Sequence, residues 1–377
     1  VIVSLSPSEH SLVMAVLERG PVARQELLKS LDLSAPSLTR LSKRFLDLGV
    51  FTEIKNMDAF QDLSLPVGRP PKGHVINPEH GHILGFKLTG RNVYGVLTDL
   101  QGTELQALQV PLDSARPEHV VQVFIEATES FRTPDLRGVG ISLGGSVAED
   151  GTVLRAPFLG WNNVDLKAWL EEAMNVLVTM ENDVVALAEG LRLFGVAKQE
   201  PNFALVTIGA GIGHALVVRG QVVKPTENGL GLGGHIPLYD GGSYCEMGHR
   251  GCSQAMLTMG SMTAQFAVLE GREVTYQGLL DLAAEGDDAA WTIVKASARA
   301  LGRMLAMSAN MSTFNVVVLG GEGTGLWQVS EEEILHELQR YRDPEAEPVQ
   351  VLVDENGFGS WAQGSSAVAL LEYLKGL

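Results

Sequence analysis

A change of pattern near residue 80 divides this sequence into two parts that must fold separately. Before it, three short segments carry apolar residues at helical spacing, and after it strand-like apolar runs alternate with helical segments. Pro71 and Pro78 oppose helix formation between the two parts. The sequence therefore predicts a small helical domain over residues 1–73, a linker over 74–81 and an α/β region from residue 82 onward.

The first part has the pattern of a winged helix-turn-helix. We expect helices over residues 7–18, 23–31 and 36–48, the last of them capped by Ser34. A short helix, a short turn and a second helix with a polar front make a helix-turn-helix. Residues 50–53 would begin a two-stranded wing, which exits near residues 68–71.

The third predicted helix carries the side chains expected at a DNA interface. Short polar residues at the start of such a helix contact base edges, while basic residues hold the phosphate backbone. The residues with these properties are Ser34, Pro36, Ser37, Thr39, Arg40, Lys43 and Arg44, and Arg69 matches an arginine that enters a narrow minor groove. Arg40 could bond to guanine or to a phosphate. The alternative is a protein-docking domain in which these charges form a solvated face.

The distribution of charge favours DNA binding by this first part alone. The whole chain carries a net charge of -17. Residues 1–73 hold 9 Lys and Arg against 8 Asp and Glu, whereas the rest holds 19 against 37. Because DNA is a polyanion, the acidic remainder would repel it, and only the nearly neutral head could touch it.

The second part predicts two α/β lobes with a ligand cleft between them. Strands are expected at residues 83–88, 93–100, 104–110, 138–143, 176–180, 203–208, 215–218 and 316–319, and helices at 117–131, 183–194, 288–310 and 361–374. The first lobe would comprise residues 82–190 with 361–377, and the second lobe, with the oligomer contacts, residues 191–360.

Both cysteines of the chain lie in one segment, residues 229–254, just downstream of a Gly-Gly-His turn. This segment resembles the signature of the ROK family of repressors and sugar kinases, Gly-Glu-x-Gly-His followed by Cys-x-Cys-Gly-x-x-Gly-Cys-x-Glu. The signature positions fall here on Leu232, His235, Cys245, Met247, Cys252 and Gln254. The resemblance extends over nearly the whole chain, and it implies a winged helix-turn-helix followed by a two-lobed actin-like (ribonuclease-H-like) fold.

The resemblance implies a structural zinc ion held by one histidine and three cysteines. His235, Cys245 and Cys252 supply three of these ligands, and Met247 takes the fourth position. Zinc seldom accepts a thioether in structural sites, so His249 or a water molecule could take its place. Packing of the thiols and imidazole without metal is the alternative.

The resemblance also implies a sugar site. Asn182 and Asp183 match the family's sugar-contacting Asn-Asp pair, and His235 lies in the signature turn. Asp183 could equally begin a helix as its cap. Phe158 replaces a sugar-binding asparagine, and Leu232 and Gln254 replace two sugar-binding glutamates. The effector is therefore less polar than a hexose, binds differently, or does not exist.

The ATP phosphate motif of the family's kinases, Gly-x-Asp-x-Gly-Gly-Thr, is altered. Here Lys87 stands in place of the aspartate and Arg91 in place of the threonine. Two further glycine turns, at residues 209–213 and 319–321, resemble the family's nucleotide turns, and steric need alone would also explain them. We expect no ATP binding and no enzymatic activity.

Taken with the resemblance, these patterns predict a transcriptional regulator, a repressor of carbohydrate metabolism genes. Such proteins act as homodimers or homotetramers on a palindromic DNA operator, with a carbohydrate effector. The alternatives are a carbohydrate kinase with a DNA-binding head and a repressor without an effector. No apolar run approaches the roughly 20 residues that span a bilayer, and no signal peptide opens the sequence, so we expect a cytoplasmic protein that does not contact membranes.

Overall fold

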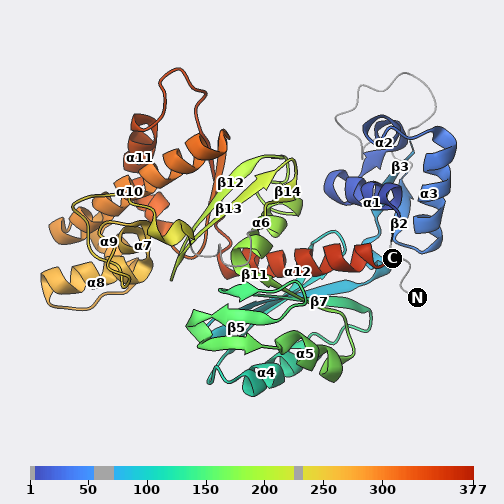
Figure 1. Ribbon diagram of the computed structural model, residues 1–377, viewed down its shortest axis with the longest axis horizontal. Coiled ribbons are helices and arrows are strands. Elements are labelled where there is room, and N and C mark those ends of the chain that lie inside the picture. The colour runs from blue at the N-terminus through green and yellow to red at the C-terminus, as the bar shows by residue number, and fades with distance from the viewer. Residues whose placement is uncertain (1–4, 55–71, 225–231) are drawn as a thin grey trace. The chain divides into compact units, whose positions relative to one another are not determined.

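The computed structural model describes residues 5–54, 72–224 and 232–377 (Figure 1). Arg69 lies outside the described residues, and so does the predicted exit of the wing. The chain divides into two compact units, Val1–Ala186 with Trp361–Leu377, and Leu187–Ser360. The predicted boundary between the two lobes, after residue 190, lies four residues beyond the boundary between these units.

The head folds as three helices and a three-stranded sheet. Its elements are α1 (Pro7–Arg19), β1 (Val22–Ala23), α2 (Arg24–Ser30), α3 (Ala35–Asp47), β2 (Phe51–Ile54) and β3 (Gly73–Ile76). Leu12, Leu27, Leu38 and Phe45 are fully buried between the helices. Ser6 and Glu9 form a capping box at the start of α1, which satisfies main-chain N–H groups there.

The predicted linker needs a correction, because its first residues belong to the head. β3 pairs antiparallel with both β1 and β2, and Phe51 lies opposite Ile76. Pro71 and Pro78 exclude a helix between them but leave residues 73–76 free to extend. A short 3-10 helix, η2 (Pro78–His80), follows and leads directly into the next strand.

The rest of the first unit is built on a five-stranded sheet of order β11-β7-β4-β5-β6. Its elements are β4 (His82–Leu88), β5 (Asn92–Asp99), β6 (Glu104–Pro111), α4 (Pro117–Ser130), β7 (Leu136–Leu143), β8 (Ser146–Val147), β9 (Val153–Ala156), η3 (Pro157–Leu159), β10 (Trp161–Val164), α5 (Leu166–Met174) and β11 (Val178–Asn182). On one face Leu84 and Phe86 pack with Phe124 of α4 and Leu170 of α5 in one buried cluster.

The last helix, α12 (Phe358–Lys375), covers the other face of this sheet (Figure 1). Two glycines let its main chain approach the strands. A Cβ atom at Gly85 would overlap the main-chain oxygen of Ala362, and one at Gly140 would overlap that of Ser365. The helix therefore lies directly on the backbone of β4 and β7.

The second unit repeats this strand arrangement in the order β14-β13-β12-β15-β16. Its elements are α6 (Asp183–Leu193), which begins in the first unit, β12 (Phe203–Ile208), β13 (Ile212–Val218), β14 (Gln221–Val222), η4 (Leu232–His235), α7 (Ser253–Leu257), α8 (Met259–Glu270), α9 (Tyr276–Ala284), α10 (Asp288–Ser312), β15 (Val316–Gly320), α11 (Gly325–Arg340) and β16 (Gln350–Val353). The long helix α10 supplies much of the core, through residues such as Leu301, Met304 and Leu305. In both units three antiparallel strands are extended by two parallel ones.

Candidate functional site

The predicted recognition helix is α3. The side chain of Ser34 caps it by accepting a hydrogen bond from the main-chain N–H of Ser37 at 3.3 Å, and Pro36 lies in its first turn. The apolar face of α3 packs against the core of the head. Arg40 and Lys43 are both exposed. Because residues three apart share a helix face, these two cations lie together on the surface.

Two of the predicted DNA-contacting side chains have partners inside the protein. Arg44 forms an ion pair with Glu9 of α1 and donates a 2.8 Å hydrogen bond to the main-chain oxygen of Leu377. Thr39 Oγ1 donates to the carbonyl of Ala35 and accepts from Arg24 at 2.8 Å. The sequence showed that these residues are polar, but their partners Glu9, Leu377 and Arg24 come from outside α3.

Asn182 acts as a helix cap. Its Oδ1 accepts hydrogen bonds from the main-chain N–H groups of Val184 at 2.9 Å and Val185 at 3.2 Å. Its Nδ2 donates to the carbonyl of Gly145 at 2.9 Å. Since the side chain is buried and its polar atoms are engaged, Asn182 holds the start of α6 in place and supports its neighbour Asp183.

Asp183 forms a buried ion pair with Lys87. Nζ of Lys87 on β4 bonds to Oδ2 of Asp183, while Oδ1 accepts from the main-chain N–H of Val184 at 2.9 Å. The Lys87 ammonium also lies over the ring of Trp361, 4.6 Å from the ring centroid. The sequence drew attention to Lys87 and Asp183 separately, and their pairing across 96 residues was not foreseen.

Phe158 lies beside this pair with an exposed side chain. It is 63% exposed in η3, next to Gly160, which has the left-handed φ of 69°. A Cβ atom at Gly144 would lie 3.3 Å from Asp183 Oδ2 and 3.4 Å from the Phe158 ring. A side chain at residue 144 would therefore contact both the carboxylate and the aromatic ring.

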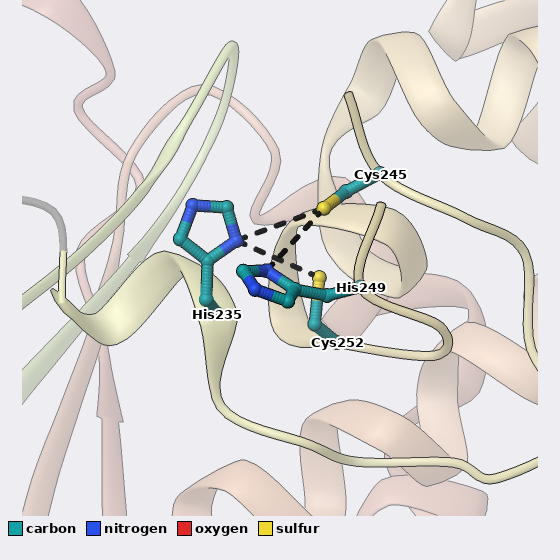
Figure 2. Close-up of side chains that lie close together, drawn as sticks. All are labelled: His235, Cys245, His249 and Cys252. Atoms are coloured by element: carbon teal, nitrogen blue, oxygen red, sulfur yellow. Dashed lines mark hydrogen bonds between the residues drawn. The ribbon is translucent and has the colours of Figure 1, made fainter. Parts of the chain in front are cut away.

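In the second unit, four side chains point toward one another in Figure 2: His235, Cys245, His249 and Cys252. Their nitrogen and sulfur atoms all lie within 4.8 Å of one another. Cys245 Sγ lies 3.7 Å from Nδ1 of both histidines, and Cys252 Sγ lies 3.8 Å from Nδ1 of His235. This is a compact set of two thiols and two imidazoles.

The donor set and its spacing fit a tetrahedral zinc ion. Bonds of about 2.3 Å to sulfur and about 2.1 Å to nitrogen place these atoms about 3.6 Å apart around the metal. The observed separations of 3.7 and 3.8 Å match that value. Burial raises the pKa of the Cys252 thiol, an opposing effect that a bound cation would overcome by favouring the thiolate.

A tight turn explains why His249, and not Met247, is the fourth member. The main-chain N–H of Cys245 bonds to the oxygen of His249 at 2.9 Å, and that of Gly248 bonds back to Cys245 at 2.9 Å. Gly248 has a φ of 82°, which closes the turn. Met247 is at its tip and 71% exposed, so of the alternatives left open by the sequence the structure favours His249 over Met247 as the fourth ligand.

The glycine turn at residues 209–213 has a carboxylate beside it. A Cβ atom at Gly209 would lie 2.6 Å from Oε1 of Glu322, which follows β15. Glu322 was missed in the sequence, where only the neighbouring glycines were noted. Of the remaining predicted ligand residues, Gln254 is half-buried at the start of α7, and the side chain of Leu232 lies outside what the structure describes.

Comparisons with known proteins agree with this architecture. The sequence profile of the ROK family matches residues 83–371. The xylose repressor of Bacillus spizizenii is 28% identical over 284 residues, which cover 73% of this chain and 72% of the relative. The repressor Mlc of Escherichia coli, named as a DNA-binding transcriptional repressor, is 25% identical over 320 residues, 80% of this chain and 77% of the relative.

Solved structures confirm the predicted fold class. A ROK family transcriptional regulator described as a homologue of E. coli Mlc superposes with a TM-score of 0.82 at 21% identity, over 98% of this chain and 96% of that one. The ROK hexokinase of Thermus thermophilus superposes with a TM-score of 0.64 at 27% identity, over 77% of this chain and 98% of that one. None of the described helices could cross a membrane. Because the profile match covers well over half of the sequence, the chain belongs to the ROK family.

Proposed function

We propose that this protein is a DNA-binding transcriptional repressor of carbohydrate metabolism genes. The observation that carries the proposal is α3, which buries Leu38 and Phe45 in the head and exposes Arg40 and Lys43. The similarity to chains named as repressors supports it. The acidic body confines contact with DNA to this helix and the wing.

The protein would act as a homodimer or homotetramer whose paired heads bind a palindromic operator. A two-fold assembly presents two recognition helices to two half-sites about one helical turn apart. A carbohydrate effector would bias the placement of the heads by binding one arrangement more tightly than the other.

DNA binding is tested with an operator that is obtained by in vitro selection with this protein. Duplexes are selected from a random pool, and the best sequence is titrated by fluorescence anisotropy against wild-type protein, Arg40→Ala, Lys43→Ala and Lys198→Ala. Lys198 is exposed in the second unit and matches the charge change. We expect each head variant to bind more weakly by about 1–3 kcal/mol and the control to bind normally. Equal affinities for all four proteins would remove α3 from the interface.

The kinase alternative is disfavoured by Lys87, which already forms an ion pair with Asp183, the position of the family's general base. A carboxylate that is stabilised by an ammonium group accepts a proton less readily. A coupled assay of ADP release across hexoses should therefore show no turnover above a protein-free blank, and saturable turnover would restore the kinase proposal.

Zinc is proposed to stabilise the loop between η4 and α7 through His235, Cys245, His249 and Cys252. The metal would supply structural cross-linking, since four protein ligands leave no open position for catalysis. Cys252 is also the cap residue of α7, so the cluster fixes the start of that helix.

A further inference from the structure

We propose that Lys87 makes the effector site selective for an anionic carbohydrate, one that carries a carboxylate or phosphate next to a hydroxyl group. This inference rests on the proposed regulatory function and names the ligand class for it. It concerns the surroundings of the Lys87–Asp183 pair, which all belong to the first unit.

Hydrogen-bond donors exceed acceptors around the pair. An ammonium has three N–H groups. Within the described residues, Lys87 bonds to one oxygen, that of Asp183, although its side chain is only 7% exposed. The indole Nε1 of Trp361, whose ring lies under Lys87, is buried without a hydrogen-bond partner in the same part of the structure.

Unpaired buried donors are costly, at about 1–3 kcal/mol each, and an acceptor-rich ligand would remove part of that cost. A neutral hexose offers hydroxyl groups, each of which must also find an acceptor for its own proton. The family's acceptors are reduced here, because Phe158 stands at the position of an asparagine and both Asp183 oxygens already accept hydrogen bonds. The balance therefore favours a ligand that brings acceptor oxygens with a negative charge.

The pair also matches a hydroxy acid in geometry. The ammonium can donate to a ligand anion, while the remaining lone pair of Asp183 Oδ2 can accept from the adjacent hydroxyl. Gly144 has no side chain to cover Oδ2, and the exposed ring of Phe158 lies beside the same glycine. An aromatic face of this kind packs against the C–H face of a sugar ring.

The acidic body does not cancel this local preference. Charges more than about 8 Å apart are largely screened at physiological salt, whereas buried charges in contact are screened much less. Asp183, the one carboxylate in contact, offsets the charge of Lys87, so the preference rests on the N–H groups of Lys87 and Trp361 that lack an acceptor.

The test is calorimetric titration of the full chain without DNA. The probes are D-glucuronate and D-gluconate for a carboxylate, glucose 6-phosphate for a phosphate, and glucose as the neutral match. Wild-type protein is compared with Lys87→Met, which keeps the stem and removes the charge, and with Lys198→Met as the charge-matched control. The wild type and the control should bind one anionic class at least 10-fold tighter than glucose.

In Lys87→Met we expect that preference to fall at least 10-fold. Circular dichroism and the thermal midpoint show whether the variant is folded, and Lys87→Arg should retain part of the preference if it is. Binding of glucose equal to that of the anions, an unchanged preference in folded Lys87→Met, or no binding of any anion at millimolar concentration would each overturn the proposal. Titration of the same protein with operator DNA tests DNA binding separately, so a failure of the effector proposal can be told from a failure of the proposed regulatory function.

Discussion

Arg44 of α3 donates a 2.8 Å hydrogen bond to the main-chain oxygen of Leu377, 333 residues further along the chain. The same guanidinium forms the ion pair with Glu9, and the hydroxyl and main-chain N–H of Ser6 also bond to that carboxylate. The Ser6 hydrogen bonds and Arg44 together lower the pKa of Glu9 to about 2. Arg44 therefore joins three segments within the first unit.

Replacing Arg44 should affect stability, whereas replacing Arg40 should affect DNA binding. Arg44→Ala removes the cation that pairs with Glu9 and the donor to the main-chain oxygen of Leu377, and we expect the free energy of unfolding to fall by about 1–3 kcal/mol. Arg40→Ala should leave stability unchanged and reduce the magnitude of the salt dependence of operator binding by about one ion. Unfolding in urea measures the stability of each variant, and fluorescence anisotropy at several salt concentrations measures the salt dependence of its operator binding. A smaller salt dependence in folded Arg44→Ala would instead place Arg44 on DNA.

Removal of His249 should release zinc, and removal of Met247 should not. His249→Ala takes one of four ligands from the cluster, so we expect metal affinity to fall at least about 100-fold. Met247 is exposed at the tip of the same turn and serves as the matched control. Elemental analysis of protein purified without added zinc should give about one ion per chain for wild type and Met247→Ala. A wild-type ratio near zero would show that the cluster packs without metal.

An added methyl group at Gly140 should displace α12, while one at Gly138 should be tolerated. At Gly140 the new carbon would overlap the main-chain oxygen of Ser365, but at Gly138 its nearest neighbour is 3.7 Å away. Overpacking of this kind costs about 1–3 kcal/mol or more. Far-ultraviolet circular dichroism follows the unfolding in urea. Equal midpoints for the two alanine variants would contradict the close approach of the helix.

His74 should make the stability of the head depend on pH. It is fully buried in β3, its ring stacks on Phe51 at 5.8 Å, and neither ring nitrogen has a partner within the described residues. Burial, helped by Arg24 and Lys72 and opposed by Glu53, lowers the pKa of His74 from 6.5 to about 4. Between these values the unfolded chain binds a proton that the folded chain does not.

The contribution of His74 is therefore complete above pH 6.5 and declines as the pH falls toward 4. The difference amounts to at most about 3 kcal/mol. Urea midpoints from pH 7 to 4.5, followed by far-ultraviolet circular dichroism, should fall less steeply for His74→Phe than for wild type. Carboxylates titrate in both proteins, so their effect cancels in the comparison. Parallel curves would show that His74 is solvated.

The helices and strands were predictable because each depends on local periodicity and capping. The third head helix, expected at residues 36–48, spans Ala35–Asp47, and the strand expected at 83–88 spans His82–Leu88. The segment 74–76 was misassigned because prolines exclude helix without distinguishing a linker from a strand. Its pairing with Phe51 depends on long-range contacts that spacing does not show.

The site was only partly predictable, for a different physical reason. His235, Cys245 and Cys252 follow a recognisable spacing, but the choice between Met247 and His249 depends on the backbone of one turn. Lys87 and Asp183 meet because β4 and β11 both pair with β7 in the same sheet. No local pattern in the sequence shows that these strands pair in one sheet.

The helix α12 has a mechanical consequence for regulation. Trp361 near its start contacts Lys87, and Tyr373 near its end shares a 2.9 Å hydrogen bond with His80, just after the head's last strand. Twelve residues of helix separate these two contacts, a span of about 18 Å. Under the proposed function, an effector bound at Lys87 would lie at one end of a single continuous helix whose other end contacts the segment joining the head to the first sheet.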